Sequence, residues 1–276
     1  MGDKISQWRV LARLLTWYGL AQVGAIMVAR SLRQGVIVPA GTLTAQVNLG
    51  EFLVYFFVAT AALMLLMRLF HWSWLYRVIL LVVIALGTAT TFEATFPLPL
   101  GLTMSFLSVL AYLLVPTVSM HNLLVVLTAT GLGPVLGLQF TPPFAAAILV
   151  ILSVYDFFAV YVSKHMVKMA TDMLSAGSLF GFIIPINKND YQAKLQLVKP
   201  GAGFMIMGGG DIVLPMLLSV SVDVGSQTGA WWVVAGSMVG VVLNHLVITK
   251  WQKPIPALPL ITVCAVFGWW IGSMLY

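Results

Sequence analysis

Charged residues are scarce in this sequence, and cysteine is almost absent. Only 8% of the 276 residues are charged and 61% are hydrophobic, whereas soluble domains carry about 25% charged residues. A water-soluble fold cannot cover so much apolar surface, so the composition indicates a protein embedded in a lipid bilayer. The single cysteine, Cys264, lies in an apolar run, which excludes a disulfide framework and a cysteine-based metal site.

Basic residues outnumber acidic ones, but they do not form a patch for nucleic acid. The net charge of +6 comes from lysines and arginines in the gaps between apolar runs, which is the pattern of membrane topology. No H-E-x-x-H sequence occurs, so a zinc metalloprotease is unsupported, and we expect no metal or other cofactor. The four histidines, His71, His121, His165 and His245, fall near the ends of apolar runs, where we expect interfacial positions.

Nine apolar stretches come close to the length of about 20 residues that crosses the hydrocarbon core. They are continuous rather than alternating, so we predict an all-α membrane protein with nine transmembrane helices. The fourth and fifth stretches are short and contain polar residues. The expected spans are approximately 10–29, 49–69, 75–92, 101–116, 121–138, 142–163, 202–222, 229–249 and 257–275.

The positions of lysine and arginine predict the orientation of these spans. With a cytoplasmic N-terminus, only Arg30 and Arg33 of the 14 basic residues lie outside. We therefore expect a multi-pass protein of the cell membrane with its N-terminus in the cytoplasm and its C-terminus outside. The first span resembles a signal peptide, but no small residue stands at the −3 position of a cleavage after Ala29, so we expect it to be retained.

One long polar connection divides the chain. It covers residues 164–201, contains the sequence KNDYQAKLQLVKPGAG, and separates six expected helices from three. We see no internal repeat of the kind that many transporters carry. The prediction is a single polytopic membrane domain over 1–276, with helices 1–6 at about 10–163, a cytoplasmic loop at 164–201 and helices 7–9 at about 202–275.

Two aspartates stand inside expected spans, where a carboxylate is costly. Asp156 lies roughly 12 Å from the cytoplasmic end of the sixth span, and Asp211 roughly 14 Å from the same face in the seventh. The other six acidic residues, Asp223 among them, lie in loops or near span ends where water is available. Because two antiparallel helices carry these aspartates at matching depths, we expect Asp156 and Asp211 to form a pair.

A close carboxyl pair suits general acid–base catalysis. Two neighbouring carboxyls cannot both ionise cheaply, so they share a proton and titrate as a unit. The ionised member can take a proton from water while the protonated member polarises a peptide carbonyl. The alternatives are a proton-coupled transporter or cation channel, and a scaffold in which the aspartates hold helices together.

A serine protease finds little support. Ser237 and His245 lie eight residues apart on one expected helix, which is roughly 12 Å along its axis. Other serine–histidine pairs remain open, although no motif points to them.

Glycine and proline accompany the aspartates. Gly208, Gly209 and Gly210 precede Asp211, and each costs about 1 kcal/mol of helix stability relative to alanine. Close helix packing would explain them, but we favour local unwinding that lets a substrate backbone approach Asp211. In the sequence PIPALPL at 254–260, the prolines either start the last helix or give it an extended approach.

Together these features resemble the presenilin and signal peptide peptidase family of intramembrane aspartyl proteases. The family's Tyr-Asp, Gly-x-Gly-Asp and Pro-Ala-Leu motifs match three segments here, in the same order and on the expected helices. The resemblance implies that the two aspartates are the catalytic pair and that the other motif residues shape the site and position substrate. The segments are Tyr155-Asp156, Gly208-Gly209-Gly210-Asp211 and Pro256-Ala257-Leu258.

The resemblance also implies the substrate, which is a transmembrane helical or signal-peptide-like peptide. Such a helix must unwind before cleavage, because its amides are already hydrogen-bonded. Prepilin-peptidase-like enzymes share an aspartate in a glycine motif, but the Tyr-Asp and Pro-Ala-Leu segments favour presenilins. The short 164–201 connection lacks the loop that presenilins cut during maturation, so we expect a single-chain enzyme. Gly209 stands where eukaryotic members usually have Leu, so their substrate preference does not carry over to this chain. The compact chain with one cysteine favours a prokaryotic or archaeal homologue, and a homo-oligomer is compatible with this interpretation.

Overall fold

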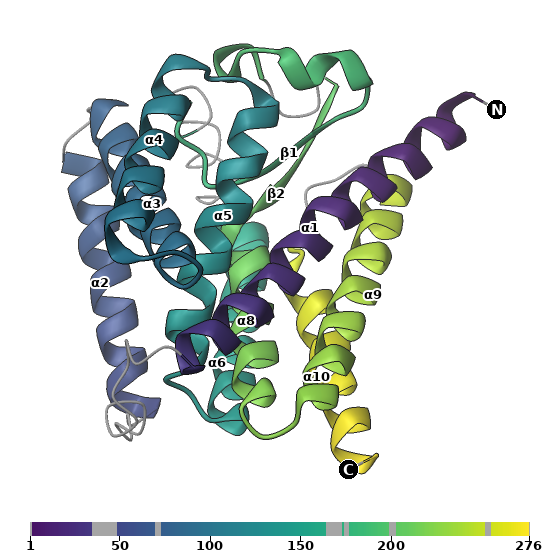
Figure 1. The fold of residues 1–276 in the computed structure, drawn as a ribbon. Helices are drawn as coiled ribbons and strands as arrows, with labels where there is room; N and C mark the ends of the chain where they lie inside the picture. The colour runs from purple at the N-terminus through teal and green to yellow at the C-terminus, as the bar shows by residue number, and fades with distance from the viewer. Residues whose placement is uncertain are drawn as a thin grey trace.

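The computed structural model describes residues 2–34, 49–69, 73–163, 173, 177–198, 203–251 and 255–275. Within these residues the protein is mostly helical, and most helices lie side by side while α1 crosses them obliquely (Figure 1). The α-helices are α1 (Gly2–Gln34), α2 (Leu49–Leu69), α3 (Ser73–Glu93), α4 (Leu98–Leu114), α5 (Val118–Gly137), α6 (Pro142–Phe158), α8 (Gly209–Asp223), α9 (Gln227–Trp251) and α10 (Leu258–Met274).

Each expected span overlaps one of these helices, which confirms the helical class. Five segments are long and apolar enough to cross a membrane by length and composition, and shorter apolar helices accompany them. The five are Gln7–Gln34, Trp74–Glu93, Val118–Gly137, Pro142–Tyr161 and Gln227–Trp251. The shorter ones are Gly50–Ala62, Leu98–Leu114 and Leu258–Met274. The number of nine spans and their orientation stay predictions.

The prediction of a helix over 202–222 is wrong at the N-terminal end of that range. Phe204–Gly208 form strand β2, and α8 begins only at Gly209. Gly208 is the N-cap residue and has an extended backbone, with φ −66° and ψ 151°. Consecutive glycines give little helix propensity, and the β2 backbone finds its hydrogen bonds in strand β1 (Gly181–Pro185) instead. The expected unwinding before Asp211 is therefore a complete change from strand to helix.

The connection at 164–201 contains regular structure in its described part. Strand β1 pairs with β2 in an antiparallel two-stranded sheet, in which Ile183 lies opposite Ile206. Two short 3-10 helices follow β1, η2 (Lys188–Gln192) and η3 (Leu195–Leu197). All five residues of β1 are buried, and so short an apolar run does not distinguish a strand from a helix by its pattern. The sheet was missed for that reason.

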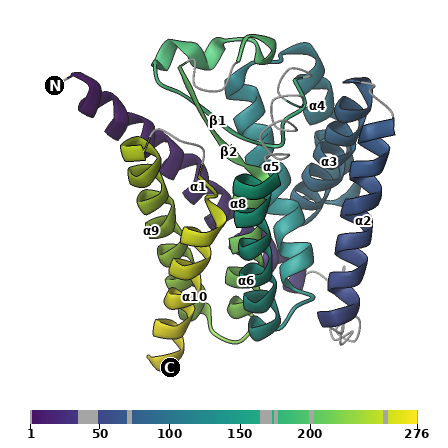
Figure 2. The ribbon, with the colours of Figure 1, turned by 180° about the vertical axis from the view of Figure 1, so that it is seen from behind.

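Two sets of contacts fix the helices around α8. The central core cluster joins α1, α5 and α8 through buried side chains such as Ala25, Ala129 and Met216. Helices α9 and α10 approach so closely that a Cβ on Gly236 or Gly268 would collide with the opposite backbone. The start of α10 is thereby held beside α6 and α8, as the views from both sides show (Figure 2).

The expectation that water surrounds Asp223 is wrong. Its side chain is only 1% exposed, and its Oδ1 lies 2.6 Å from Nη2 of Arg30. Arg33 approaches the other carboxylate oxygen at 3.4 Å. The cause is tertiary, because the C-terminal ends of α1 and α8 meet there and a buried carboxylate needs such partners. Both arginines that the topology prediction places outside belong to this cluster.

Candidate active site

Asp156 lies near the end of α6, in a buried position. Helix α6 ends at Phe158 and the chain continues as a π-helical turn, Ala159–Ser163. Asp156 is 7% exposed, and the backbone N–H of Leu258 is placed to donate to its carboxylate. The Pro-Ala-Leu segment at the start of α10 therefore touches the first aspartate directly.

Asp211 lies in the first turn of α8 and is partly exposed. The backbone N–H of Gly208 is placed to donate to its carboxylate. A carboxylate in the first helical turn is also stabilised by the helix dipole. Asp156 is near enough to act on Asp211 electrostatically, because α6 and α8 pack together through apolar side chains such as Leu149 and Leu218. The structure thus brings the two aspartates together.

The three glycines before Asp211 are not equivalent. The N–H of Gly209 donates to the carbonyl of Phe180 at 2.9 Å, and a Cβ on Gly209 would fall on the Phe180 ring. A Cβ on Gly210 would meet only Cδ1 of Leu214, at 4.0 Å. A Cβ on Gly208 would lie 3.5 Å from Oδ2 of Asp211, an ordinary contact. Of these three glycines, only Gly209 must lack a side chain because of packing.

The other motif residues surround the pair from two sides. Tyr155 is half-buried and meets Phe57 of α2 edge to face, with ring centroids 5.8 Å apart. Pro256 is buried and precedes α10, whereas Pro259 lies in the first turn of that helix. Both expectations for the proline segment therefore hold, because Pro256 lies in the approach to the last helix and Pro259 lies at its start. Ala257 is the N-cap residue of α10 and packs against the central core cluster.

Helices α1 and α9 add polar residues that the sequence interpretation missed. Tyr18 is 0% exposed and lies beside Gln22 and Ser237, within electrostatic reach of Asp211. Among the described residues its hydroxyl has no partner with normal hydrogen-bond geometry, while Gln22 donates to the carbonyl of Ile212 at 3.1 Å. Tyr18 and Gln22 lie four residues apart in the apolar stretch of α1 and share one face of the helix, a signal that could have identified them.

Helix α5 holds the outer edge of β1. The side-chain amide of Asn122 donates to the carbonyl of Ile183 at 2.7 Å, and its oxygen accepts from the N–H of Ile183 at 2.9 Å. His121 Nε2 lies 2.9 Å from the carbonyl oxygen of Gly181. These side chains replace a neighbouring strand along that edge of the sheet.

Two of the four histidines are buried inside the protein, and the depth of the histidines in the membrane stays a prediction. His121 is 1% exposed and His245 is 6% exposed. His121 is buried because the β1 backbone supplies its hydrogen-bond partner. His71 and His165 lie outside the described residues.

The fold and the site define a helical membrane protein with a carboxyl pair between adjacent helices. A family model described as "Signal-peptide peptidase, presenilin aspartyl protease" matches residues 15–276. The chain therefore belongs to the signal peptide peptidase and presenilin family and is an intramembrane aspartyl protease. The transporter or channel alternative is not favoured.

Two solved structures have a similar fold. One is described as a presenilin family intramembrane aspartate protease in space group C222; its TM-score is 0.67 and its sequence identity 21%, over 96% of this chain and 99% of that chain. The other is the structure of a presenilin family intramembrane aspartate protease in space group P2, with a TM-score of 0.67 and 21% identity, over 95% of this chain and 96% of that chain. A search of curated proteins gave no match.

Proposed function

We propose that Asp156 and Asp211 are the catalytic residues and that they hydrolyse peptide bonds of transmembrane helical substrates. The observation that carries this proposal is their pairing across α6 and α8, with a backbone N–H from Leu258 or Gly208 directed at each carboxylate. Two of the three motif segments thus act on the aspartates through their backbone. Tyr155, the remaining glycines, Pro256 and Ala257 would then shape the site around the substrate.

The reaction needs one proton shared between the two carboxyls. The ionised aspartate takes a proton from a water molecule, whose oxygen attacks the peptide carbonyl carbon, while the protonated aspartate donates to the carbonyl oxygen. The product of this step is a tetrahedral gem-diol. Protonation of the amide nitrogen then breaks the C–N bond and releases an amine and a carboxylic acid. The partial exposure of Asp211 gives water a route to the pair.

The free edge of β2 offers a place for the unwound substrate. Asn122 bonds both peptide groups of Ile183, so these groups point away from β2. Ile183 and Ile206 are therefore a non-hydrogen-bonded pair, and the N–H and C=O of Ile206 point to the opposite edge of the sheet. No hydrogen bond from a described residue occupies that edge at Ile206.

An extended peptide can add to such an edge as a third strand. Strand β2 leads directly into Gly208 and Asp211, so a segment paired with it would have its amides beside the aspartates. Pairing would also replace the hydrogen bonds that the substrate helix loses when it unwinds. This edge fits a transmembrane helical or signal-peptide-like peptide that has been locally extended.

The proposed setting is a single membrane domain of nine spans in the cell membrane, with a cytoplasmic N-terminus. The overlap of each expected span with a described helix supports the count. The N- and C-termini lie at opposite ends of the molecule (Figure 1), as an odd number of spans requires. The distribution of lysine and arginine supports the orientation.

The test replaces either aspartate by asparagine. Wild-type protein, Asp156→Asn and Asp211→Asn would be reconstituted with a transmembrane reporter peptide, and its cleavage measured by mass spectrometry. We expect the cleavage rate of each variant to fall by about 100- to 10,000-fold, the range of general acid–base catalysis. Asp190→Asn, which changes a carboxylate of η2 outside the site, is the matched control and should keep the wild-type rate.

Folding and inhibition separate the alternatives. Circular dichroism and thermal unfolding would check that the asparagine variants remain folded, and a hydroxyl-bearing mimic of the gem-diol should block the wild type. A scaffold role predicts full cleavage by both asparagine variants. That result in folded proteins would disprove the assignment of the catalytic pair.

A further inference from the structure

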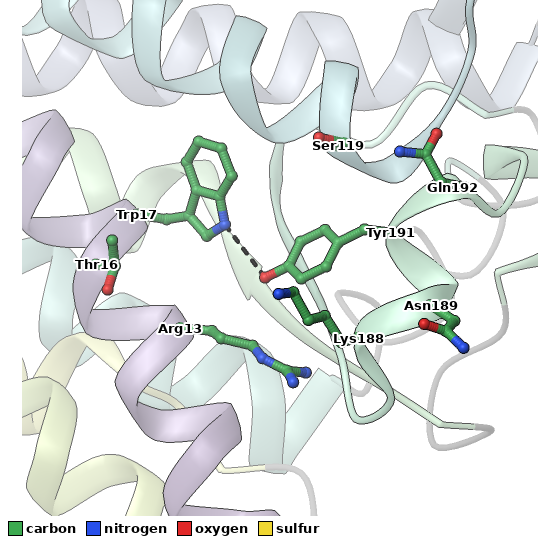
Figure 3. Close-up of a pocket in the computed structure, with 8 residues that line it drawn as sticks. All are labelled: Arg13, Thr16, Trp17, Ser119, Lys188, Asn189, Tyr191 and Gln192. Carbon is green, nitrogen blue, oxygen red and sulfur yellow. Dashed lines mark hydrogen bonds between the residues drawn. The ribbon is translucent and has the colours of Figure 1, made fainter.

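A second polar site lies away from the aspartates. A cavity of about 780 Å³ opens between the N-terminal half of α1, the start of α5 and the 3-10 helix η2 (Figure 3). Its volume is in the range of small-molecule sites, about 300–1,000 Å³. None of the motif residues of the proposed active site lines it. The aspartyl protease reaction therefore does not explain this cavity.

The charge in the cavity has one sign. Arg13 and Lys188 both line it, and none of the described aspartates and glutamates does. Asp190 belongs to the same 3-10 helix as Lys188 but is not among the lining residues. Within the described part of the chain, neither Arg13 nor Lys188 forms a salt bridge. Two basic side chains without a carboxylate partner favour an anionic ligand.

Arg13 is held in position before any ligand binds. Its Nη1 donates to the carbonyl oxygens of Pro185 at 2.8 Å and Ile186 at 3.0 Å. Its guanidinium carbon lies 5.9 Å from the centroid of the Tyr191 ring. These contacts use one nitrogen, so the other N–H groups of the guanidinium remain to bind oxygen atoms. A fixed guanidinium loses less entropy when it binds a phosphate oxygen pair.

Neutral donors surround the two cations. The indole N–H of Trp17 donates to the Tyr191 hydroxyl at 3.3 Å, which joins α1 to η2 (Figure 3). The hydroxyl of Ser119 lines the cavity from the start of α5, and the side-chain amide of Gln192 lines it from the end of η2. Several hydrogen-bond donors around two cations match a group with three or four oxygen atoms and negative charge, such as phosphate.

The position along α1 indicates where such a group would come from. Arg13 and Trp17 lie one turn apart where the apolar stretch of α1 begins, and tryptophan with a basic residue is typical of the membrane interface. Phospholipid phosphates lie at that depth. We propose that this cavity binds a phosphate group, as an anionic phospholipid headgroup presents it. The proposal is independent of the protease reaction, and it assigns the cavity to the cytoplasmic leaflet through the orientation given above.

Native mass spectrometry can test the proposal on the full-length protein in a neutral detergent. The probes are phosphatidylglycerol, phosphatidylcholine and inorganic phosphate, each titrated separately and in competition. We expect one phosphatidylglycerol to bind more tightly than phosphatidylcholine. Lys188→Gln should weaken this binding about tenfold, the effect of losing one charged hydrogen bond. Lys194→Gln is the matched control, because Lys194 is an exposed lysine of the same segment that does not line the cavity.

The two phosphate sources give different outcomes. If inorganic phosphate displaces the lipid, the site recognises phosphate itself; if it does not, the acyl chains or glycerol contribute to binding. Both results support the proposal. Equal losses in Lys188→Gln and Lys194→Gln would show non-specific attraction and overturn it. Failure of both phosphatidylglycerol and inorganic phosphate to bind would also overturn it. Thermal unfolding would confirm that each variant is folded.

Discussion

Replacement of Gly209 by alanine tests how the start of α8 positions Asp211. A Cβ at this position would fall on the Phe180 ring and lie 2.9 Å from the Phe180 carbonyl oxygen. The ring packs against two core clusters and cannot simply turn away. Overpacking of this kind costs about 1–3 kcal/mol of unfolding free energy. Gly210→Ala is the matched control, since its Cβ would meet only Leu214 at 4.0 Å and alanine favours the helix by about 1 kcal/mol.

The collision should reach the proposed catalytic pair. The N–H of Gly209 bonds the Phe180 carbonyl at 2.9 Å, and Asp211 follows two residues later in the same helical turn. If the backbone yields instead of the ring, Asp211 shifts relative to Asp156. A displacement of about 1 Å can cost on the order of 100-fold in rate. We therefore expect Gly209→Ala to lower cleavage by about 10- to 100-fold and Gly210→Ala to lower it less.

The assay is cleavage of a transmembrane reporter peptide by purified variants, with thermal unfolding of each protein. The two readouts together separate a misplaced aspartate from a protein that has lost its fold. The reasoning is refuted if Gly209→Ala is fully active while Gly210→Ala is impaired. That pattern would mean that the open space at Gly210 receives the substrate and that Phe180 adapts freely.

Substitutions at three further positions test separate contacts. Tyr18→Phe removes a buried hydroxyl without a partner of normal geometry, so the free energy of unfolding should hold or rise. If this hydroxyl orients the water at Asp211, cleavage should fall about tenfold; unchanged cleavage would contradict this role. Ile206→Pro removes an N–H from the free edge of β2 and should lower cleavage at least tenfold, whereas Ile206→Ala should keep most of the cleavage activity. Equal losses in the two variants would show that the side chain of Ile206, and not its N–H, is needed. Asp223→Asn leaves the partly exposed Arg30 without its carboxylate partner. The free energy of unfolding, measured by thermal melts, should fall by about 1–3 kcal/mol. An unchanged melting temperature would show that the ion pair contributes little.

Much of the helical architecture could be predicted because the bilayer limits the choices. Continuous apolar runs can satisfy their backbone only as helices, so the bounds expected for α2 agree with the structure, and those for α3 differ by two residues at most. The pair of aspartates followed from a similar constraint. A carboxylate is costly in an apolar helix, which left Asp156 and Asp211 as the two that needed a partner.

The sheet could not be predicted from the sequence, because its cause is tertiary. Strand β1 is a short apolar run, and its outer edge is completed by an asparagine side chain 61 residues earlier in the chain. Nothing local to β1 or to Asn122 indicates that contact. The burial of Asp223 was missed for the same reason, since the carboxylate is neutralised by Arg30 at the far end of α1. Sequence patterns report local periodicity, whereas these contacts depend on which helices meet.

The strand before α8 explains why glycines stand next to the carboxylate of Asp211. A continuous helix through 202–222 would have hidden every amide near Asp211 in its own hydrogen bonds. The change from β2 to α8 at Gly209 instead places a free strand edge, a helix N-terminus and a carboxylate within a few residues of one another. In the mechanism we propose, each would have a separate role: the edge would pair with an extended substrate, the N-terminus would stabilise negative charge, and the carboxylate would handle the proton together with Asp156. The non-helical backbone is satisfied within the protein, because β1 pairs with β2, and Asn122 and His121 bond the outer edge of β1.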